Sequence, residues 1–210
     1  MRAIRKEAEP SSLTAWIQEN PQGRYGDLTP DIRRTIRQHA LEEQFYLCAY
    51  CCQRIGTIDD CHNEHLEAQS LNPARSLDFS NIVASCNTSM QCGKAHQSQP
   101  LPLTPVMAEC ETELQFNISG RVRGLSDRAQ KMIQVLNLGD HENNNRALVE
   151  KRKALSDALL WKCWGDPQEL EDEHSDILRS LIDELAQPNQ EKLEPFAPVV
   201  VNIVRSWLQA

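Results

Sequence analysis

The chain has 210 residues, of which 40% are apolar and 25% charged, enough to bury a core in one domain or in one small domain with an appendage. It lacks a run of about 18 apolar residues and opens with the charged segment MRAIRKEAEP. We therefore expect a soluble, cytoplasmic protein with neither a membrane-spanning helix nor a secretory signal. The formal charge is −8, and the stretch from Asp166 to Glu194, with ten acidic side chains against Arg179 and Lys192, accounts for the whole excess. The remainder is charge-balanced, so the chain alone should hold phosphate weakly.

The first part of the chain is predicted to be irregular and then helical. Proline, glycine and asparagine punctuate residues 10–30, which predicts an irregular N-terminal segment over residues 1–29, apart from a helical turn near Trp16. Thr29 followed by Pro30 is typical of a helix N-cap and first turn. Apolar spacing then predicts a helix over residues 30–44. β-branched residues favour a short strand over residues 54–60, and an apolar run over residues 81–85 leads into Cys86.

Beyond Pro105 the pattern becomes mainly helical. Alternation of apolar residues over 114–118 predicts a strand, followed by a turn at Ser119-Gly120. Amphipathic spacing predicts helices over residues 126–138, 146–164, 169–186 and 200–208, the second of them closed by Gly165-Asp166-Pro167. We expect Trp161, Trp164 and Trp207 to be core or interface anchors. The predicted fold is α+β and mostly α-helical, in three parts: an irregular segment 1–29, a compact unit 30–105 and a mainly helical region 106–210.

Six of the eight cysteines lie within 45 residues, at positions 48, 51, 52, 61, 86 and 92. Disulfides are disfavoured in a reducing cytosol, where clustered thiols more often bind metal. The spacing Cys48-Ala-Tyr-Cys51 suits two thiolates on one tetrahedral zinc ion, and Cys86 and Cys92 can complete the set. We predict a structural zinc on these four. Cys52 and Cys61 compete as ligands, and the alternatives are buried thiols or a thioredoxin-like redox pair.

Any chemistry is expected between Cys48 and His96. Glu64-His65 places an oxygen ligand for a hard cation beside a group that takes a proton near neutral pH. Adjacent strand residues point to opposite faces, so both reach one phosphate only where the strand bends or ends. The side chain of Asn81 can tie loop backbone together. His96, four residues after Cys92, is expected on a helix or turn tethered by the zinc.

These spaced elements resemble the HNH endonuclease family, whose ββα-metal core carries a His-Asn-His set between two zinc-binding cysteine pairs. The pattern is most similar to the PtuB-type proteins of Septu and retron antiphage defence systems, over about residues 30–155. It rests on the segments Glu42-Glu43-Gln44, Cys48-Ala-Tyr-Cys51, Asn63-Glu64-His65-Leu66, Asp78-Phe79-Ser80-Asn81-Ile82, Cys86, Leu114-Gln115-Phe116, Ser119-Gly120, Val135-Leu136-Asn137-Leu138 and Asn145-Arg146. The resemblance implies a zinc-stabilised ββα-metal core within residues 30–105.

The resemblance also implies roles for the site residues. His65 is expected to be the general base that takes a proton from the attacking water. Glu64 and His96 are expected to hold Mg²⁺ or another divalent cation. Asn81 is expected to brace the loop that orients His65, and Cys48, Cys51, Cys86 and Cys92 to hold the zinc.

Two departures from the family pattern qualify these roles. The family commonly has CxxC as its second pair and a His or Asn directly after the last cysteine, whereas five residues separate Cys86 from Cys92 here and Gly93 follows. Lys94 is therefore an alternative phosphate contact, and His62 is an alternative base or metal ligand. Neither HExxH nor HxxEH occurs, because Cys61 stands where the inverted motif needs histidine, so a zincin-type protease is not expected. His39, His141 and His174 are expected to be structural.

Partners are implied by the resemblance alone. They are PtuA, an ATPase of the ABC/SMC-like kind, and in retron systems a reverse-transcribed DNA–RNA. The expected substrate is double-stranded DNA, with single-stranded DNA and structured RNA such as tRNA left open. Region 106–210 is expected to include docking surface, so deletion of residues 166–210 should weaken the complex. Two other function classes stand beside the nuclease: a zinc-stabilised interaction module with a vestigial HNH site, and a thiol-based redox or metal-buffering protein.

Overall fold

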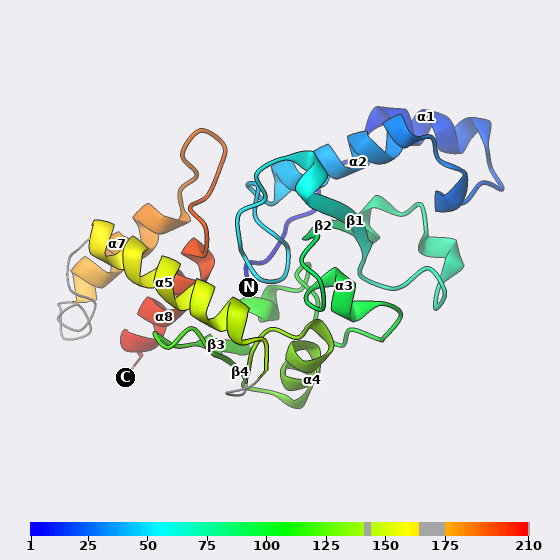
Figure 1. The fold of residues 1–210 in the computed structure, drawn as a ribbon. Coiled ribbons are helices and arrows are strands. Elements are labelled where there is room, and N and C mark those ends of the chain that lie inside the picture. Colours follow the sequence, from blue (N-terminus) through cyan, green and yellow to red (C-terminus); the bar gives the residue numbers. More distant parts are fainter. Residues whose placement is uncertain (141–143, 164–174, 210) are drawn as a thin grey trace.

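The computed structural model describes residues 1–140, 144–163 and 175–209 of the chain. The fold is α+β and mainly helical, with two small antiparallel sheets (Figure 1). The helices and strands are, in chain order, α1 (Ser11–Glu19), α2 (Pro30–Glu43), β1 (Cys61–His65), β2 (Ile82–Cys86), α3 (Gly93–His96), β3 (Leu114–Phe116), β4 (Val122–Gly124), α4 (Asp127–Leu136), α5 (Arg146–Cys163), α7 (Ser175–Ala186) and α8 (Ala197–Trp207). No described helix has the length and apolar character needed to cross a membrane.

The N-terminal segment is not irregular as predicted, because it contains α1. This helix begins directly after Pro10, and Leu13, Trp16 and Ile17 recur at helical spacing. Leu13 is buried in the main core, Trp16 and Ile17 pack against it, and α1 contacts α2. Tertiary packing of one short apolar stripe therefore stabilises a helix that the surrounding proline and glycine residues obscure in the sequence.

The predicted helix over residues 30–44 is confirmed as α2, whereas the predicted strand over residues 54–60 is wrong. At the start of α2, Thr29 Oγ1 accepts a hydrogen bond from the Ile32 amide at 3.3 Å. Arg54 forms an isolated bridge with Leu47, and Ile58–Asp60 forms a 3₁₀ turn. The backbone amide of Thr57 donates to the Asp60 carboxylate at 2.8 Å, so a local capping interaction replaces the ladder that its β-branched neighbours suggested.

A two-stranded sheet lies beside α2, and the one-turn helix α3 follows it. β1 pairs antiparallel with β2, with Cys61 opposite Cys86 and His65 opposite Ile82. α2 packs on both strands, and its end is tied to β2 because the Ala84 amide donates to the Gln44 side chain at 2.8 Å. α3 follows β2 closely in space (Figure 1). This arrangement brings the residues after Cys92 next to the face of β1.

Among its described residues, the second half adds a β-hairpin and the helices α4, α5, α7 and α8. β3 and β4 form the hairpin predicted around residues 114–120, and α4, α5 and α8 confirm three of the predicted helices. α7 begins at Ser175, and the earlier part of the predicted helix over residues 169–186, like the predicted turn at residues 165–167, lies outside the described residues. A small apolar cluster joins α5, α7 and α8, with Leu160, Leu181 and Val204 buried.

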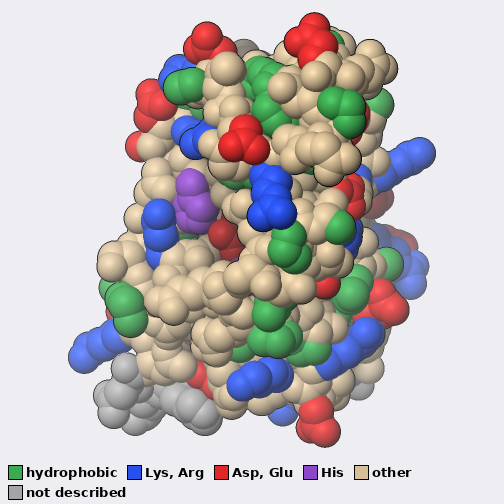
Figure 2. Space-filling view, turned by 90° about the vertical axis from the view of Figure 1, so that its right-hand side faces the viewer, with side chains coloured by type: hydrophobic (Ala, Val, Ile, Leu, Met, Phe, Trp, Pro, Cys, Tyr) green, Lys and Arg blue, Asp and Glu red, His purple; other side chains and the backbone are tan. Residues whose placement is uncertain are grey.

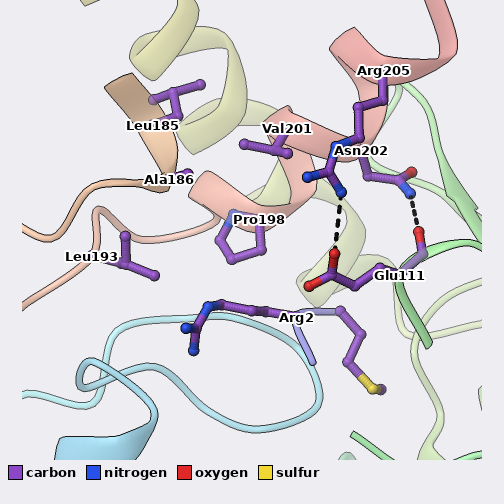
Figure 3. A pocket seen from close by; sticks show the side chains of 10 residues that line it. Arg2, Glu111, Leu185, Ala186, Leu193, Pro198, Val201, Asn202 and Arg205 are labelled. Atoms are coloured by element: carbon purple, nitrogen blue, oxygen red, sulfur yellow. Dashed lines mark hydrogen bonds and ion pairs between the residues drawn. The ribbon is translucent and has the colours of Figure 1, made fainter. Parts of the chain in front are cut away.

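α8 is fixed to the hairpin by a polar side chain. Asn202 accepts a hydrogen bond from the Phe116 amide at 2.8 Å and donates to the carbonyl oxygens of Leu114 at 2.9 Å and Glu111 at 3.1 Å. Beside it, Arg205 pairs with the Glu111 carboxylate at 3.1 Å (Figure 3). Glu111, Asn202 and Arg205 line a small cavity together with Arg2 from the N-terminal segment. The residues singled out in the sequence for chemistry lie elsewhere.

One hydrophobic core runs across the predicted boundary at residue 105. It contains Ile82 and Phe79 from the compact unit together with Leu114, Met132 and Phe196 from the helical region. The backbone amide of Phe196 also donates to the Cys52 carbonyl at 2.9 Å. Deletion of residues 166–210 would remove Phe196, Val199 and Ile203 from this core, so such a deletion would test folding rather than docking.

Candidate metal centre and histidine cluster

The four cysteines predicted to bind zinc come together in space. The sulfur atoms of Cys48, Cys51, Cys86 and Cys92 all lie within 4.8 Å of one another, and all four residues are buried. We call this set the sulfur cluster. Cys48 and Cys51 lie in the turn after α2, Cys86 ends β2, and Cys92 precedes α3. Four sulfurs bound about 2.3 Å from a tetrahedral zinc lie about 3.8 Å apart, so the arrangement fits a metal ion such as zinc.

Hydrogen-bond donors surround the sulfur cluster. The Cys86 amide points at Cys48 Sγ at 3.4 Å, and the Gln91 side-chain amide lies 3.7 to 3.9 Å from the sulfurs of Cys86, Cys51 and Cys92. Burial raises the pKa of Cys51 and Cys92, whereas hydrogen bonds from the other three cysteines hold the pKa of Cys86 well below its usual range. Several buried thiolates are stable together only when a cation neutralises them.

The competing cysteines point elsewhere. Cys61 Sγ lies 3.4 Å from the Ile58 carbonyl oxygen, and burial raises its pKa to about 12. Cys52 is buried in the main core, where burial also raises its pKa. Both behave as buried thiols, which is the alternative interpretation that the sequence left open for the whole group.

The period of β1 separates the predicted site residues into two sets. His62 and Glu64 lie on one face of the strand and Asn63 and His65 on the other. Asn63 donates to the Tyr25 hydroxyl at 2.7 Å, and the Tyr25 ring meets the His65 ring edge-on at 4.7 Å. The sequence required a strand end or bulge at Glu64 for Glu64 and His65 to serve one substrate, but β1 runs through Glu64 to His65 and leaves the two side chains on opposite faces.

Glu64 meets two histidines. Its Oε1 lies 2.6 Å from His96 Nδ1 and its Oε2 lies 3.3 Å from His62 Nε2. The Tyr50 hydroxyl, from the turn that carries Cys48 and Cys51, donates to Oε1 at 3.4 Å. Burial alone would raise the pKa of Glu64, but hydrogen bonds and charge from His62 and His96 outweigh it and lower that pKa. We call His62, Glu64 and His96 the histidine–carboxylate cluster.

Gly93 makes this cluster possible. A β-carbon placed on Gly93 would lie 2.5 Å from both His62 Nε2 and Glu64 Oε2. The Gly93 amide donates to Ser85 Oγ at 3.0 Å, which holds the start of α3 against β2. Gly93 stands where the family commonly has His or Asn, and the space of that side chain is filled by His62 and Glu64 from β1. The neighbouring Lys94 is exposed.

His65 is held in a different environment. Its Nε2 lies 2.9 Å from the Ser76 carbonyl oxygen, and its Nδ1 lies 3.3 Å from the side-chain nitrogen of Gln69. A carbonyl oxygen only accepts, so Nε2 carries the hydrogen and Nδ1 has a free lone pair in the neutral ring. Burial lowers the pKa of His65, and the Ser76 contact and Glu64 oppose that shift. The ring is therefore oriented as a base.

Asn81 ties together the loop between β1 and β2. Its side chain accepts a hydrogen bond from the Glu67 amide at 2.9 Å and donates to the carbonyl oxygens of Glu67 at 3.0 Å and Arg75 at 3.3 Å. Arg75 directly precedes Ser76, whose carbonyl orients His65. Asn81 is therefore bonded to the loop segment that precedes Ser76, and its role in orienting His65 stays a prediction.

Several contributors to these clusters were missed in the sequence. Tyr50, Gln91 and Asn87, whose Oδ1 lies 3.0 Å from His62 Nδ1, come from turns whose side-chain directions follow from no periodic pattern. His62 was named in the sequence only as an alternative base or metal ligand, although the period of a strand places it on one face with Glu64.

The sequence matches no protein-family model and no curated protein. The similarity to HNH endonucleases drawn from the motifs therefore stays a prediction.

Proposed function

We propose that this chain is a metal-dependent endonuclease of the HNH type, which hydrolyses phosphodiester bonds in nucleic acid. The observation that carries the proposal is the convergence of the Glu64 carboxylate with two imidazoles on a β1–β2–α3 unit tied by four cysteines. A general base oriented by a carbonyl stands at the end of the same strand. Zinc in the sulfur cluster would hold the turn, β2 and α3 in this arrangement.

The donors of the histidine–carboxylate cluster suit a divalent cation. Two ligands at right angles on an ion with bonds of about 2.1 Å lie about 3 Å apart, close to the 2.6 Å between Glu64 Oε1 and His96 Nδ1. Glu64 and His96 would hold Mg²⁺ or a similar cation there. When bound, the cation neutralises charge on the phosphate and on the leaving oxygen.

His65 would take the proton from the attacking water. The Ser76 carbonyl keeps the hydrogen on Nε2, which leaves Nδ1 as the accepting nitrogen. The Gln69 amide, 3.3 Å from Nδ1, occupies a position where that water would have to lie. Substrate binding therefore requires the loop that carries Gln69 to shift.

Closure of the site favours a second candidate, a zinc-stabilised interaction module with a vestigial HNH site. His96 is 0% exposed, His65 7% and Glu64 8%. A phosphodiester reaches these side chains only after the residues that cover them move. In this alternative the same residues serve to stabilise the fold.

The surface supports a role for a partner in holding the substrate. Figure 2 shows acidic and basic side chains interspersed with polar and apolar ones over one face, without a field of one sign. Free nucleases need a cationic surface to hold a polyanion. We propose that an ABC/SMC-like ATPase supplies that grip in an antiphage defence complex, where nucleic acid is the substrate and a retron DNA–RNA is a further candidate component.

Among the described residues of region 106–210, Trp161 is the exposed aromatic side chain available for docking. Trp161 on α5 is 57% exposed, whereas Trp207 packs against the apolar clusters and Trp164 lies outside the described residues. Trp161→Ala should lower the yield of the complex with the ATPase while the isolated chain unfolds at the same temperature. An unchanged yield would place the docking surface elsewhere.

A cleavage assay tests the nuclease proposal. The zinc-loaded full chain, alone and with its copurifying proteins, is incubated with plasmid DNA, single-stranded DNA and tRNA in the presence of Mg²⁺ or Mn²⁺. We expect cleavage of at least one substrate, lost in His65→Ala and retained in His39→Ala, a histidine on α2. Folded, zinc-loaded protein that cleaves none of them with any cation or partner would favour the interaction module.

A further inference from the structure

We propose that His62 is a further ligand of the catalytic cation and completes a three-residue site with Glu64 and His96. This inference rests on the proposed function, because it concerns the cation that the nuclease would use. The sequence resemblance assigned that cation to Glu64 and His96 alone. The contacts at both ring nitrogens of each imidazole support adding His62 to that site.

The outer nitrogens of the two imidazoles each face an oxygen that accepts. His96 Nε2 lies 2.6 Å from the Gln99 carbonyl oxygen, and His62 Nδ1 lies 3.0 Å from Asn87 Oδ1. The orientation of the Asn87 amide is assigned from its nitrogen, because Nδ2 donates to the Asp59 carbonyl oxygen at 3.0 Å and Oδ1 then faces His62. Each outer nitrogen therefore carries a hydrogen, as metal-binding histidines do when their second nitrogen donates to a carbonyl or amide oxygen.

The inner nitrogens then face one carboxylate, as hydrogen-bond donors when protonated and as metal ligands when not. His96 Nδ1 faces Glu64 Oε1 and His62 Nε2 faces Oε2, so the two rings take one oxygen each. Two neutral imidazole lone pairs and a carboxylate repel one another at such distances. Either a proton on each ring or one cation must lie between them. A single divalent cation satisfies all three groups together.

Gly93 reserves the space for this arrangement. Any side chain there would begin 2.5 Å from His62 Nε2 and Glu64 Oε2. The ring of His62 therefore occupies the space that a side chain at position 93 would otherwise fill. His62 from β1 takes the place of a ligand from α3.

The cluster must close around the ion. Histidine nitrogens, cysteine sulfurs and carboxylate oxygens can all serve as ligand atoms. Among the described residues, only the four cysteine sulfurs form a set of three or more within 4.8 Å of one another. The ligand atoms of His62, Glu64 and His96 are therefore spread more widely. The His62 side chain is 22% exposed and that of His96 1%, which leaves His62 freer to move. We therefore place the closing movement at His62.

Manganese binding tests the inference apart from catalysis. Mn²⁺ is titrated into the zinc-loaded full chain and free Mn²⁺ is followed by electron paramagnetic resonance. We expect one bound Mn²⁺ in the wild type, an affinity at least about 10-fold weaker in His62→Ala, and wild-type affinity in the control His39→Ala. Gly93→Ala, which displaces both His62 and Glu64, should weaken Mn²⁺ binding at least as much as His62→Ala while zinc content stays at one per chain.

The outcomes separate the inference from the function on which it rests. Wild-type affinity in both His62→Ala and Gly93→Ala, with binding lost in Glu64→Ala, would overturn the role of His62 and leave the two-ligand nuclease site intact. Absence of Mn²⁺ binding by the wild type would overturn both the inference and the cation of the proposed function. Zinc content and the thermal midpoint of each variant show that loss of Mn²⁺ is not loss of the fold.

Discussion

The sulfur cluster and the histidine–carboxylate cluster lie on the same small scaffold and differ in how complete they are. The sulfur cluster draws four buried ligands from a turn, the end of β2 and the residue before α3, and all four atoms lie within 4.8 Å. The histidine–carboxylate cluster draws its groups from β1 and α3, and its ligand atoms are spread more widely. Structural metal sites are closed by four protein ligands, whereas catalytic sites keep positions for water or substrate. Under the proposed function, the sulfur cluster would hold the fold and the histidine–carboxylate cluster would perform the chemistry.

Removal of a sulfur ligand should have the largest effect. Cys48→Ser or Cys86→Ser should abolish zinc binding and unfold the central unit, because a structural zinc contributes about 10 kcal/mol or more to folding. Zinc analysis and thermal unfolding measure this effect, with Cys163→Ser, outside the cluster, as the control. Unchanged thermal midpoints in both variants would mean that the four thiols are merely buried.

Substitutions in the second cluster should separate binding of the cation from proton transfer. His65→Ala should lower cleavage by about 10²- to 10⁴-fold and leave Mn²⁺ affinity unchanged, because its ring bonds to Ser76 and Gln69. Glu64→Ala should lose both cleavage and Mn²⁺ binding. Rate measurements beside Mn²⁺ titrations distinguish the two roles. Cleavage at the wild-type rate in His65→Ala would reassign the base.

Gln91 connects the sulfur cluster to the helical region, so its loss should weaken zinc binding without abolishing it. Its amide nitrogen faces three sulfurs, and its oxygen accepts from Asn145 at 3.1 Å, at the start of α5. Gln91→Ala should lower zinc affinity by about 10- to 100-fold. Competition with a chelator measures the change, and Gln38→Ala on α2 is the control. Equal resistance of Gln91→Ala and wild type to the chelator would contradict this connection.

Asn81 should have the smallest effect of this set. Asn81→Ala removes three loop hydrogen bonds from a buried side chain and should cost about 1–3 kcal/mol of stability. The cleavage rate should fall as well, since the loop carries Ser76, while Mn²⁺ affinity is retained. Asn72→Ala, in the same loop with one bond to the Glu67 carboxylate, is the control for denaturant unfolding. Equal stability of Asn81→Ala and Asn72→Ala would contradict the bracing role of Asn81.

The two clusters also differ in how far the sequence predicts them. The CxxC spacing of Cys48 and Cys51 and the later pair predicted the four sulfur ligands, since each pair is local in the chain. α2 was also predicted from a local signal, since Thr29 and Pro30 mark its start. The contact of His62 with Glu64 depends on the absence of a side chain at Gly93. The sequence predicted only a helical turn where α1 lies and missed the 3₁₀ turn at Ile58–Asp60, because packing and a local capping interaction decide them.

The most direct test of the two-cluster account is a crystal structure of the zinc-loaded full chain soaked in Mn²⁺, with anomalous scattering recorded at the zinc and manganese edges. The account predicts a zinc peak among the sulfurs of Cys48, Cys51, Cys86 and Cys92, and a separate manganese peak bounded by Glu64, His96 and His62. A folded chain with zinc among the sulfurs but no manganese at Glu64 would contradict it.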